Sequence, residues 1–402
     1  MRRAAFLLVV VAAVAVPAPG SGASGSARLA LMPLAKSDLG PDAIALPLDP
    51  DSGVQSSADA ARDANGKVTA AQLTALGRVT GYALDYSDSA GKALVAGRGL
   101  LRVQTGVERY RSAAAARKAL AFWRRDEADL TLLRASGVKA SERFFTPAGL
   151  RGPSFGMSGS ATVSGKPPIY GVDVDFVQGD LVGKVSVAAA DAASRRAYAD
   201  GLAVKLAARI AGVLAGRIGG APVPLPGKLK AGPPPNGPDL AALALTPADL
   251  GQVTVVKTQG YTLDRNLSPL SAYKRFYSPA GVFLTLQEEV ALFHSATEAS
   301  FTFATFASGI RSPALFAAYG GGLTFTDLKT VPVHAGDEAA AVTALARLPT
   351  GQTVLESIAV VRVGPTMEML AIVDLPTMTI SRADLQTLAA AAAKRAAAGL
   401  HR

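Results

Sequence analysis

Three stretches of the amino-acid sequence occur twice in the same order, and this internal repeat sets the strongest limit on the fold. One opens each copy with Leu, three variable residues and Asp-Leu-Gly, another carries Gly-Tyr and then Leu-Asp, and in the third five of seventeen residues are identical. The matched stretches are 34–40 with 245–251, 81–85 with 260–264, and 107–123 with 290–306. The sequence therefore predicts two diverged copies of one domain.

A segment rich in Pro and Gly separates the two copies. Residues 216–239 begin GRIGGAPVPLPGKLKAGPPPNGP and have no apolar period, which is typical of an extended linker. We therefore expect a first copy over 31–215 and a second over 240–400. The spacing of the motifs gives the first copy about 32 additional residues. We assign them to an insertion at about 47–76, rich in Asp, Ser, Gly and Ala, which we expect on the surface and outside the core.

Both copies show the same order of predicted elements. Short strands come first, and a helix follows that Ser112 or Ser295 caps, with a capping box between Ser295 and Glu298. Further strands are predicted at 169–177, 181–187, 353–363 and 367–373, and Ala-rich closing helices at 192–214 and 381–400. The predicted fold class is α+β, a tandem duplication in which each copy has a mostly antiparallel sheet with helices packed on one face.

The N-terminus has the features of a secretory signal peptide. Arg2 and Arg3 precede an uninterrupted apolar run over 4–16, which at about 20 Å is too short to cross a bilayer as a helix. Pro17 ends the run and small residues follow, so we assign residues 1–27 to the signal and expect export to the cell envelope or medium. An uncleaved anchor is the alternative. The sequence contains no cysteine, which leaves no lipid acceptor, no disulfide and no zinc site of the cysteine type.

The charge of the chain indicates a class of partner. Lys and Arg number 41 against 31 Asp and Glu, and the net charge is +10. We therefore predict reversible electrostatic attachment to an anionic envelope surface or polymer, while basicity that serves only solubility is the alternative. A small apolar ligand or a protein partner is a further class. Nucleic acid is not expected, because no run of Lys and Arg is interleaved with aromatic residues.

No set of residues has the spacing of a catalytic or metal-binding motif. The three histidines, His294, His334 and His401, match no ligand spacing. His334 lies near Asp337 and Glu338 in a Gly-containing loop that could serve acid–base chemistry, and a solvated turn is the alternative. We therefore assign no catalytic, cofactor-binding or metal-binding residue, we expect no cofactor, and we do not expect an enzyme.

Two further patterns are incomplete versions of known sites. Asp49, Asp51, Asp59 and Asp63 lack the register and the final Glu of a calcium loop. Residues 156–160, GMSGS, lack the last glycine of a nucleophile elbow, and we interpret them as a flexible loop.

Two residue types recur in both copies, and we interpret both as structural. Asp38 and Asp249 would cap a local turn. Tyr82 and Tyr261 would point inward from a strand with the hydroxyl at the rim of the core.

The repeated opening motif, the Gly-Tyr strand and the Ser-capped helix on a sheet resemble small exported domains of actinobacteria. Among these are the extracellular sensor domain of mycobacterial receptor Ser/Thr kinases and certain envelope lipoproteins, which commonly rely on cysteines that this sequence lacks. The resemblance implies a secreted, non-catalytic binding or sensing module of the cell envelope. The alternatives are a structural envelope protein and an extracellular hydrolase with an unrecognised site. The acids that could meet in such a site are Asp173, Asp175, Asp337 and Glu338.

Overall fold

The computed structural model divides the chain into two compact units between residues 228 and 229. The residues that it describes are 27–63, 68–88, 92–127, 138–162, 166–192, 195–227, 231–234, 237–250, 254–262, 269–279, 285–311, 324–347, 353–374 and 382–400. The expected signal over 1–27 lies outside them, except for its last residue. Among these residues, no helix combines the length and the apolar character that a membrane span requires.

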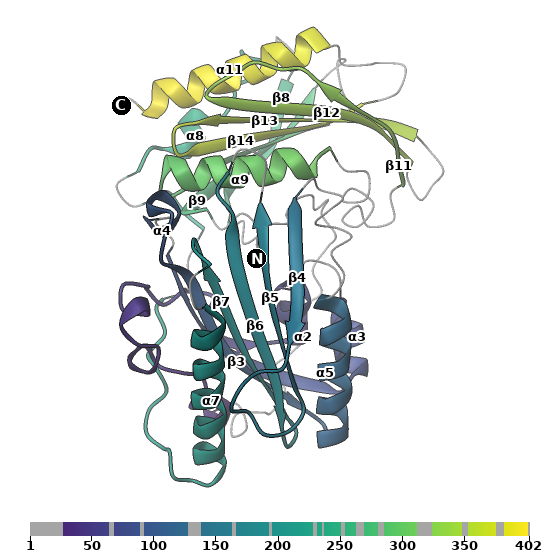
Figure 1. Cartoon of the computed structure of the whole chain (residues 1–402). Helices are drawn as coiled ribbons and strands as arrows, with labels where there is room; N and C mark the ends of the chain where they lie inside the picture. Colours follow the sequence, from purple (N-terminus) through teal and green to yellow (C-terminus); the bar gives the residue numbers. More distant parts are fainter. Residues whose placement is uncertain are drawn as a thin grey trace. The chain divides into compact units, whose positions relative to one another are not determined.

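The first unit contains a seven-stranded antiparallel sheet in the order β1-β2-β3-β7-β6-β5-β4 (Figure 1). Its strands are β1 Gly53–Gln55, β2 Arg78–Ser87, β3 Leu100–Tyr110, β4 Lys139–Phe145, β5 Ser154–Thr162, β6 Ile169–Gln178 and β7 Leu181–Ala189. Its helices are η1 Lys36–Asp38, η2 Pro41–Ala43, α2 Ser57–Asp63, α3 Ala70–Ala75, α4 Lys92–Ala96, α5 Ala113–Glu127 and α7 Arg195–Leu214.

The second unit contains another seven-stranded antiparallel sheet, in the order β11-β12-β13-β14-β10-β9-β8. Its strands are β8 Thr254–Thr262, β9 Ser271–Pro279, β10 Thr285–Leu292, β11 Thr324–Val331, β12 Glu338–Arg347, β13 Thr353–Val363 and β14 Thr366–Asp374. Its helices are α8 Leu240–Leu243, α9 Ala296–Gly309 and α11 Arg382–Leu400.

The two sheets have the same topology. Counted from the first strand of each unit, both run 1-2-3-7-6-5-4, with one long helix after the third strand and another after the seventh. The strand registers agree with the third motif, which matches Val107 with Val290. In each unit this valine lies opposite a tyrosine of the second strand, Tyr82 in the first unit and Tyr273 in the second. The predicted α+β class, the antiparallel sheets and the tandem repeat are therefore confirmed.

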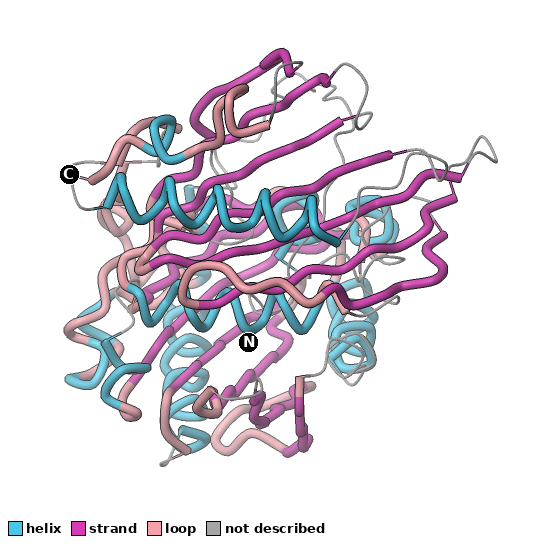
Figure 2. Tube along the Cα trace, turned by 90° about the horizontal axis from the view of Figure 1, so that it is seen from above, coloured by secondary structure: helices cyan, strands magenta, loops and turns pink. Residues whose placement is uncertain are grey.

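The two long helices of each unit lie on opposite faces of the sheet, which corrects the expectation of one covered face. In the first unit Val182 packs with α5, whereas Val185 packs with α7. The equivalent residues of the second unit, Met367 and Leu370, pack with α9 and α11 respectively. Figures 1 and 2 show α9 and α11 running along the sheet of the second unit, on either side of it. Central strands are apolar at consecutive positions because both their faces are buried.

The turns between the last two strands of each unit lie in the gaps between the strands predicted at 169–177 and 181–187 and at 353–363 and 367–373. Gly179 lies between β6 and β7 with a φ of 64°, and Gly364 follows β13 with a φ of 54°. Residues with a side chain rarely adopt such angles, so glycine suits both turns. The stretch 156–160 lies inside β5, so its interpretation as a flexible loop is wrong.

Both predicted serine caps are present. The N–H of Ala115 donates to Ser112 Oγ at 3.2 Å, and the N–H of Glu298 donates to Ser295 Oγ at 3.1 Å. The Glu298 carboxylate accepts from the N–H of His294 at 3.0 Å, one residue before the position that a capping box uses.

The segment assigned to an insertion outside the core contributes to the fold. Its residues 53–55 form β1, which pairs with β2 and corresponds to β8 of the second unit. The additional elements are α2 and α3, in a connection over 56–77 that is much longer than its counterpart over 263–270. Val68 and Leu73 are buried in one cluster with Tyr110 and Trp123 of the strand and helix beside them. The expectation of a surface excursion is therefore wrong for this part.

The match of the two Gly-Tyr motifs is also corrected. Tyr82 lies on the second strand of its unit, whereas Tyr261 lies on the first strand of the other. The strand registers instead show that Tyr273 is the equivalent of Tyr82, and that Tyr277 is the equivalent of Tyr86. Both pairs of tyrosines are buried, so the repeat survives in the aromatic residues of this strand rather than in the dipeptide.

Candidate functional site

The repeated opening motif docks onto the third strand in both units. In the first unit the N–H of Leu34 donates to Thr105 Oγ1 at 3.0 Å, and the Tyr86 hydroxyl donates to the Leu34 carbonyl at 3.4 Å. Asp38 closes the turn by accepting from the N–H of Ala35 at 2.9 Å. The interpretation of Asp38 as a turn cap is confirmed.

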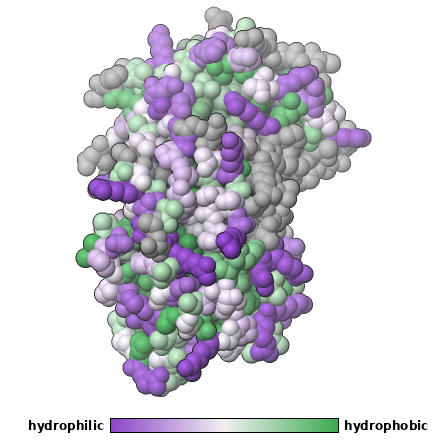
Figure 3. Space-filling model, in the orientation of Figure 1, coloured by the Kyte–Doolittle hydropathy of each residue, from purple (hydrophilic) through white to green (hydrophobic). Residues whose placement is uncertain are grey.

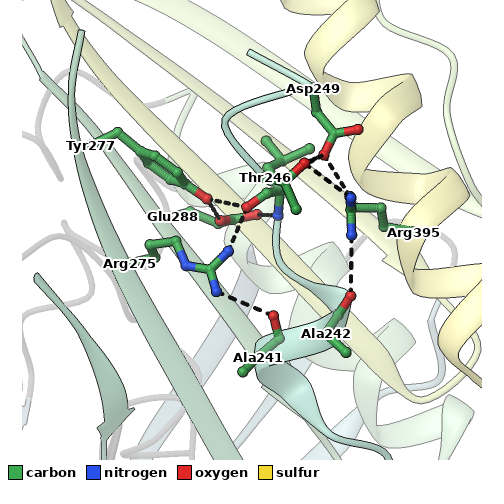
Figure 4. Close-up of polar contacts among 9 residues, drawn as sticks. Ala241, Ala242, Thr246, Asp249, Arg275, Tyr277, Glu288 and Arg395 are labelled. Carbon is green, nitrogen blue, oxygen red and sulfur yellow. Dashed lines mark hydrogen bonds and ion pairs between the residues drawn. The ribbon is translucent and has the colours of Figure 1, made fainter. Parts of the chain in front are cut away.

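In the second unit a carboxylate replaces the threonine (Figure 4). The N–H of Leu245 donates to Glu288 Oε1 at 2.7 Å, and the Tyr277 hydroxyl lies 2.5 Å from the Leu245 carbonyl and 2.5 Å from Glu288 Oε2. Asp249 accepts from the N–H of Thr246 at 2.7 Å, as Asp38 does in its own turn. The backbone N–H of the opening motif is therefore bound by a charged side chain in this unit and by a neutral one in the first.

Two more buried side chains complete this second-unit cluster, which we define as Arg275, Tyr277, Glu288 and Glu368. Arg275 donates from Nη1 to the Leu245 carbonyl at 2.5 Å and from Nη2 to the Ala241 carbonyl at 3.3 Å. Glu288 is 0 % exposed and Glu368 is 3 % exposed. Two carboxyl groups are therefore held under the opening turn, away from water.

The surroundings of this cluster disfavour a second negative charge beside Glu288. The Tyr277 hydroxyl, which has one hydrogen, lies between two acceptors, the Leu245 carbonyl and Glu288. Burial, and then the charge of Glu288 and a hydrogen bond to it, raise the pKa of Glu368 well above its ordinary value. Burial and the Glu288 charge likewise raise the pKa of Tyr277, which stays neutral. The raised pKa favours the neutral form of the Glu368 carboxyl in the folded protein.

An ion pair fastens the turn above this cluster to the last helix. Arg395 on α11 donates from Nε to Asp249 Oδ2 at 2.6 Å and from Nη2 to Thr246 Oγ1 at 3.0 Å. Burial alone would raise the pKa of Asp249, but the hydrogen bonds from Thr246 and Arg395 outweigh burial and lower it. The first unit has the equivalent pair, Arg209 with Asp38, at 3.5 Å.

The first unit has a charge cluster on the other face of its sheet, beneath α5. Glu108 lies 3.3 Å from Arg78 Nε and 3.5 Å from Lys184 Nζ, and it accepts from the Tyr110 hydroxyl at 2.7 Å. Trp123 on α5 donates to the Tyr110 hydroxyl at 3.4 Å. Lys184 Nζ lies 3.9 Å from the centre of the Trp123 ring. We call these five residues the first-unit cluster.

A backbone irregularity and a glycine make room for Arg78. The register of β2 shifts between Arg78 and Thr80, which turns Arg78 toward α5 while the later residues of the strand keep their alternation. Its side chain is fully buried. A Cβ at Gly81 would lie 2.6 Å from Arg78 Nη2, so a side chain there would displace the guanidinium.

Neither cluster is conserved between the two copies. The residues equivalent to Glu108, Tyr110, Trp123 and Lys184 are Ala291, Phe293, Phe306 and Met369. The residues equivalent to Arg275, Glu288 and Glu368 are Leu84, Thr105 and Gly183. A Cβ at Gly183 would lie 2.3 Å from the Phe176 ring, so an aromatic ring fills the space that Glu368 fills in the other copy. One shared scaffold thus carries a different charge cluster in each of its two copies.

The loop considered for acid–base chemistry is an ion-pair network. Arg362 Nη1 binds Asp337 at 2.9 Å, and Arg362 Nε binds Glu338 at 2.5 Å. The Gln386 side chain holds the backbone N–H and carbonyl of His334, each at 2.8 Å. The acids anchor the start of β12 to β13, and the histidine is fixed through its backbone.

The remaining candidates also have local roles. Asp49 accepts from the N–H of Asp51, Asp59 accepts from Ser56, and His294 lies 3.2 Å from Glu298. No group of three or more His, Cys, Asp or Glu is arranged to hold a metal in the part of the chain that the structure describes. The side chain of Asp63 and residue His401 lie outside that part.

The four acids considered for a hydrolase site separate into two pairs. Asp173 and Asp175 lie on β6 of the first unit, and Asp337 and Glu338 lie in the second. Asp175 is 1 % exposed and pairs in register with Lys184, beside the first-unit cluster.

The sequence contains a signal for the second-unit cluster that pattern analysis missed. Glu288 lies two residues from both Leu286 and Val290, and Glu368 lies two residues from Leu370. Side chains at such a spacing share one face of a strand, so both acids had to point into the core. The signal is an acidic residue that lies two residues from apolar residues of the buried face of a strand.

No family model, curated protein or solved structure matches the chain. The fold and the two clusters define its class: a tandem repeat of a seven-stranded α+β domain with a charge cluster specific to each copy.

Proposed function

We propose that the protein is exported and serves as a non-catalytic binding or sensing module of the cell envelope. The observation that carries this proposal is that each copy buries a charge cluster where the other copy has uncharged residues. A buried ion pair costs several kcal/mol of desolvation per ion before its contacts offset that cost. Because the other copy folds with uncharged residues at these positions, the clusters are specialisations of each copy rather than demands of the fold.

The contacts of the clusters favour holding and sensing over turnover. Glu288 is engaged by the Leu245 N–H and the Tyr277 hydroxyl, and its charge contributes to raising the pKa of Glu368. A change of charge at this pair acts directly on the opening turn, whose other end Arg395 ties to the last helix. This is the arrangement that a sensing domain needs, a buried group linked to a surface segment. The resemblance to exported sensor domains supports the same function.

Export is tested with a reporter that is active only outside the cytoplasm. Residues 1–30 fused to alkaline phosphatase should give an active enzyme in a bacterial host. Replacing Val9 and Val10 by Arg interrupts the apolar run and should abolish the activity. The control, Ser21→Ala, should retain it. Activity that does not depend on the apolar run would contradict export by this segment.

Binding is separated from catalysis by incubating the full chain with isolated cell envelopes. We expect saturable retention of the protein and no progressive release of soluble fragments into the supernatant. Release over many turnovers would favour the hydrolase. The pairs Asp337→Asn with Glu338→Gln, and Asp173→Asn with Asp175→Asn, would then identify the unit that carries the activity.

A further inference from the structure

The outer face of α5 carries a cluster of positive charge. Figure 3 shows hydrophilic side chains spread over both units, so hydropathy alone does not distinguish a docking surface, and the sign of the charge has to be considered. The exposed basic residues of α5 are Arg117, Lys118, Arg124 and Arg125. No acidic residue occurs among residues 113–125 of this helix.

The spacing of these residues places them on one side of the helix. Arg117 and Arg124 are seven residues apart, as are Lys118 and Arg125, so each pair forms a row along the axis. The two rows are separated by about 100° around the helix. Ala114 lies between them, and so does the exposed Ala121. We define these four basic residues as the basic face of α5.

Packing of the helix does not require these charges. Ala116 and Trp123, on the opposite side of α5, make the contacts with the sheet. The residues of α9 equivalent to the basic face are Ser300, Phe301, Ala307 and Ser308. The basic face is therefore a property of the first unit and not of the fold.

The four positive charges of the basic face exceed the two acids that α5 itself carries, Asp126 and Glu127 at its end. Helix α3, which packs beside α5, carries no charged residue. Strand β4 carries the half-buried Glu142, and the turn before β7 carries the exposed Asp180. The Arg124 guanidinium lies 5.6 Å from the centre of the Phe144 ring, which leaves its charge in place.

We propose that the basic face of α5 is the contact site for an anionic phospholipid surface. The inference rests on the proposed envelope location and names the partner and the surface. Because the rows are parallel to the helix axis, a helix that lies flat brings all four side chains to the phosphates of one plane. Guanidinium groups bind phosphate through paired donors, and the long stems let the charges reach the headgroups.

The test measures binding of the full chain to vesicles by co-sedimentation. One set contains phosphatidylglycerol in phosphatidylcholine, and the other is phosphatidylcholine alone, which reports any contribution of the apolar run over 4–16. The double variant is Arg117→Gln with Arg125→Gln. The matched control, Arg98→Gln with Arg217→Gln, removes the same charge from other exposed positions of the first unit. Thermal unfolding of each variant verifies that it is folded.

We expect the Arg117 and Arg125 variant to lose about 30-fold in affinity for the anionic vesicles, because each basic residue near such a surface contributes about a factor of five. The control should lose less than about threefold. Binding of the unchanged chain should weaken steeply as salt rises from about 0.05 to 0.5 M.

Equal losses in the two variants would show that only net charge matters and would overturn the site. Binding to isolated walls without binding to anionic vesicles would overturn the choice of partner. A chain that is exported but does not bind vesicles would contradict this inference alone, whereas vesicle binding through α5 by a chain that is not exported would contradict the proposed function alone.

Discussion

Thr105 and Glu288 occupy the same position in the two copies and accept a hydrogen bond from the same backbone N–H. The threonine hydroxyl does this as a neutral group. The glutamate brings a charge into the core, where the Tyr277 hydroxyl and the nearby Arg275 compensate it. One substitution on a shared scaffold therefore required several others around it.

The repeat supplies its own control for the tyrosine of this cluster. Tyr277→Phe removes a hydroxyl that contacts the Leu245 carbonyl and Glu288, and leaves a buried charged group with one fewer partner. We expect a loss of about 2 to 3 kcal/mol in the free energy of unfolding. Tyr86→Phe removes a single 3.4 Å contact to the Leu34 carbonyl and should cost about 1 kcal/mol or less. Urea denaturation of both variants tests this, and equal losses would show that the charge cluster is energetically neutral.

Glu356 on β13 makes the stability of the second unit depend on pH. Burial raises the pKa of Glu356 from 4.5 to about 7. Below about pH 4.5 both the folded and the unfolded chain hold this proton. As the pH rises toward 7 the unfolded chain releases the proton first, so the folded state loses stability by up to about 1.4 kcal/mol per pH unit. The contribution of Glu356 is therefore present below pH 4.5 and lost by about pH 7.

Glu356→Gln keeps the shape of the side chain and removes the titration. The loss of stability between about pH 4.5 and pH 7 should become smaller by about 3 kcal/mol than in the unchanged chain. Urea denaturation at a series of pH values measures it. The exposed Asp51→Asn variant should keep the original dependence, and an unchanged slope in Glu356→Gln would show that the folded carboxyl titrates normally.

At the level of elements, α3 is the clearest difference between the two copies. Leu73 is 0 % exposed and packs with Ala116 and Trp123 of α5, so Leu73→Ala should leave a cavity and cost about 3 kcal/mol. Val54→Ala, at a side chain that is 59 % exposed in the preceding strand, should change stability by less than about 0.5 kcal/mol. Chemical denaturation compares them, and a small loss in Leu73→Ala would restore the interpretation of this segment as a surface excursion.

The elements with strict patterns could be predicted from the sequence alone. Strand β13 has the predicted bounds, β14 extends one residue beyond them at each end, and the glycine turns beside them form where turn residues were found. The predicted α+β repeat followed from these elements. Such patterns depend only on nearby residues, so they predict an element without knowledge of the strands with which it pairs.

The missed features depend on which strands meet. The dipeptide Gly81-Tyr82 matches Gly260-Tyr261 in sequence, but pairing places the two dipeptides on different strands of their sheets. Helices on both faces were also missed, because an apolar residue at every position of a strand shows that both faces are buried only once the strand is known to be central. The charge clusters were missed because Glu288 and Glu368 lie in the middle of strands and belong to no motif.

At the level of the whole molecule, each unit contains what a domain needs to fold. No strand pairing connects the two sheets among the described residues, and each sheet is packed with its own pair of long helices. Two domains with complete cores in one chain normally unfold as separate cooperative units. The division between residues 228 and 229 falls within the segment predicted to be a linker.

Scanning calorimetry of the full chain should therefore show two transitions that can be moved one at a time. Leu73→Ala should lower the midpoint of the first-unit transition by about 10 °C, since it removes about 3 kcal/mol from a domain of this size. Leu385→Ala, at a fully buried position of α11, should lower only the other midpoint by a similar amount. Glu356→Gln then provides an internal check, because it should change the pH dependence of the transition that Leu385→Ala moves and leave the other unchanged. A single transition that all three variants shift together would show that the two copies fold as one cooperative unit.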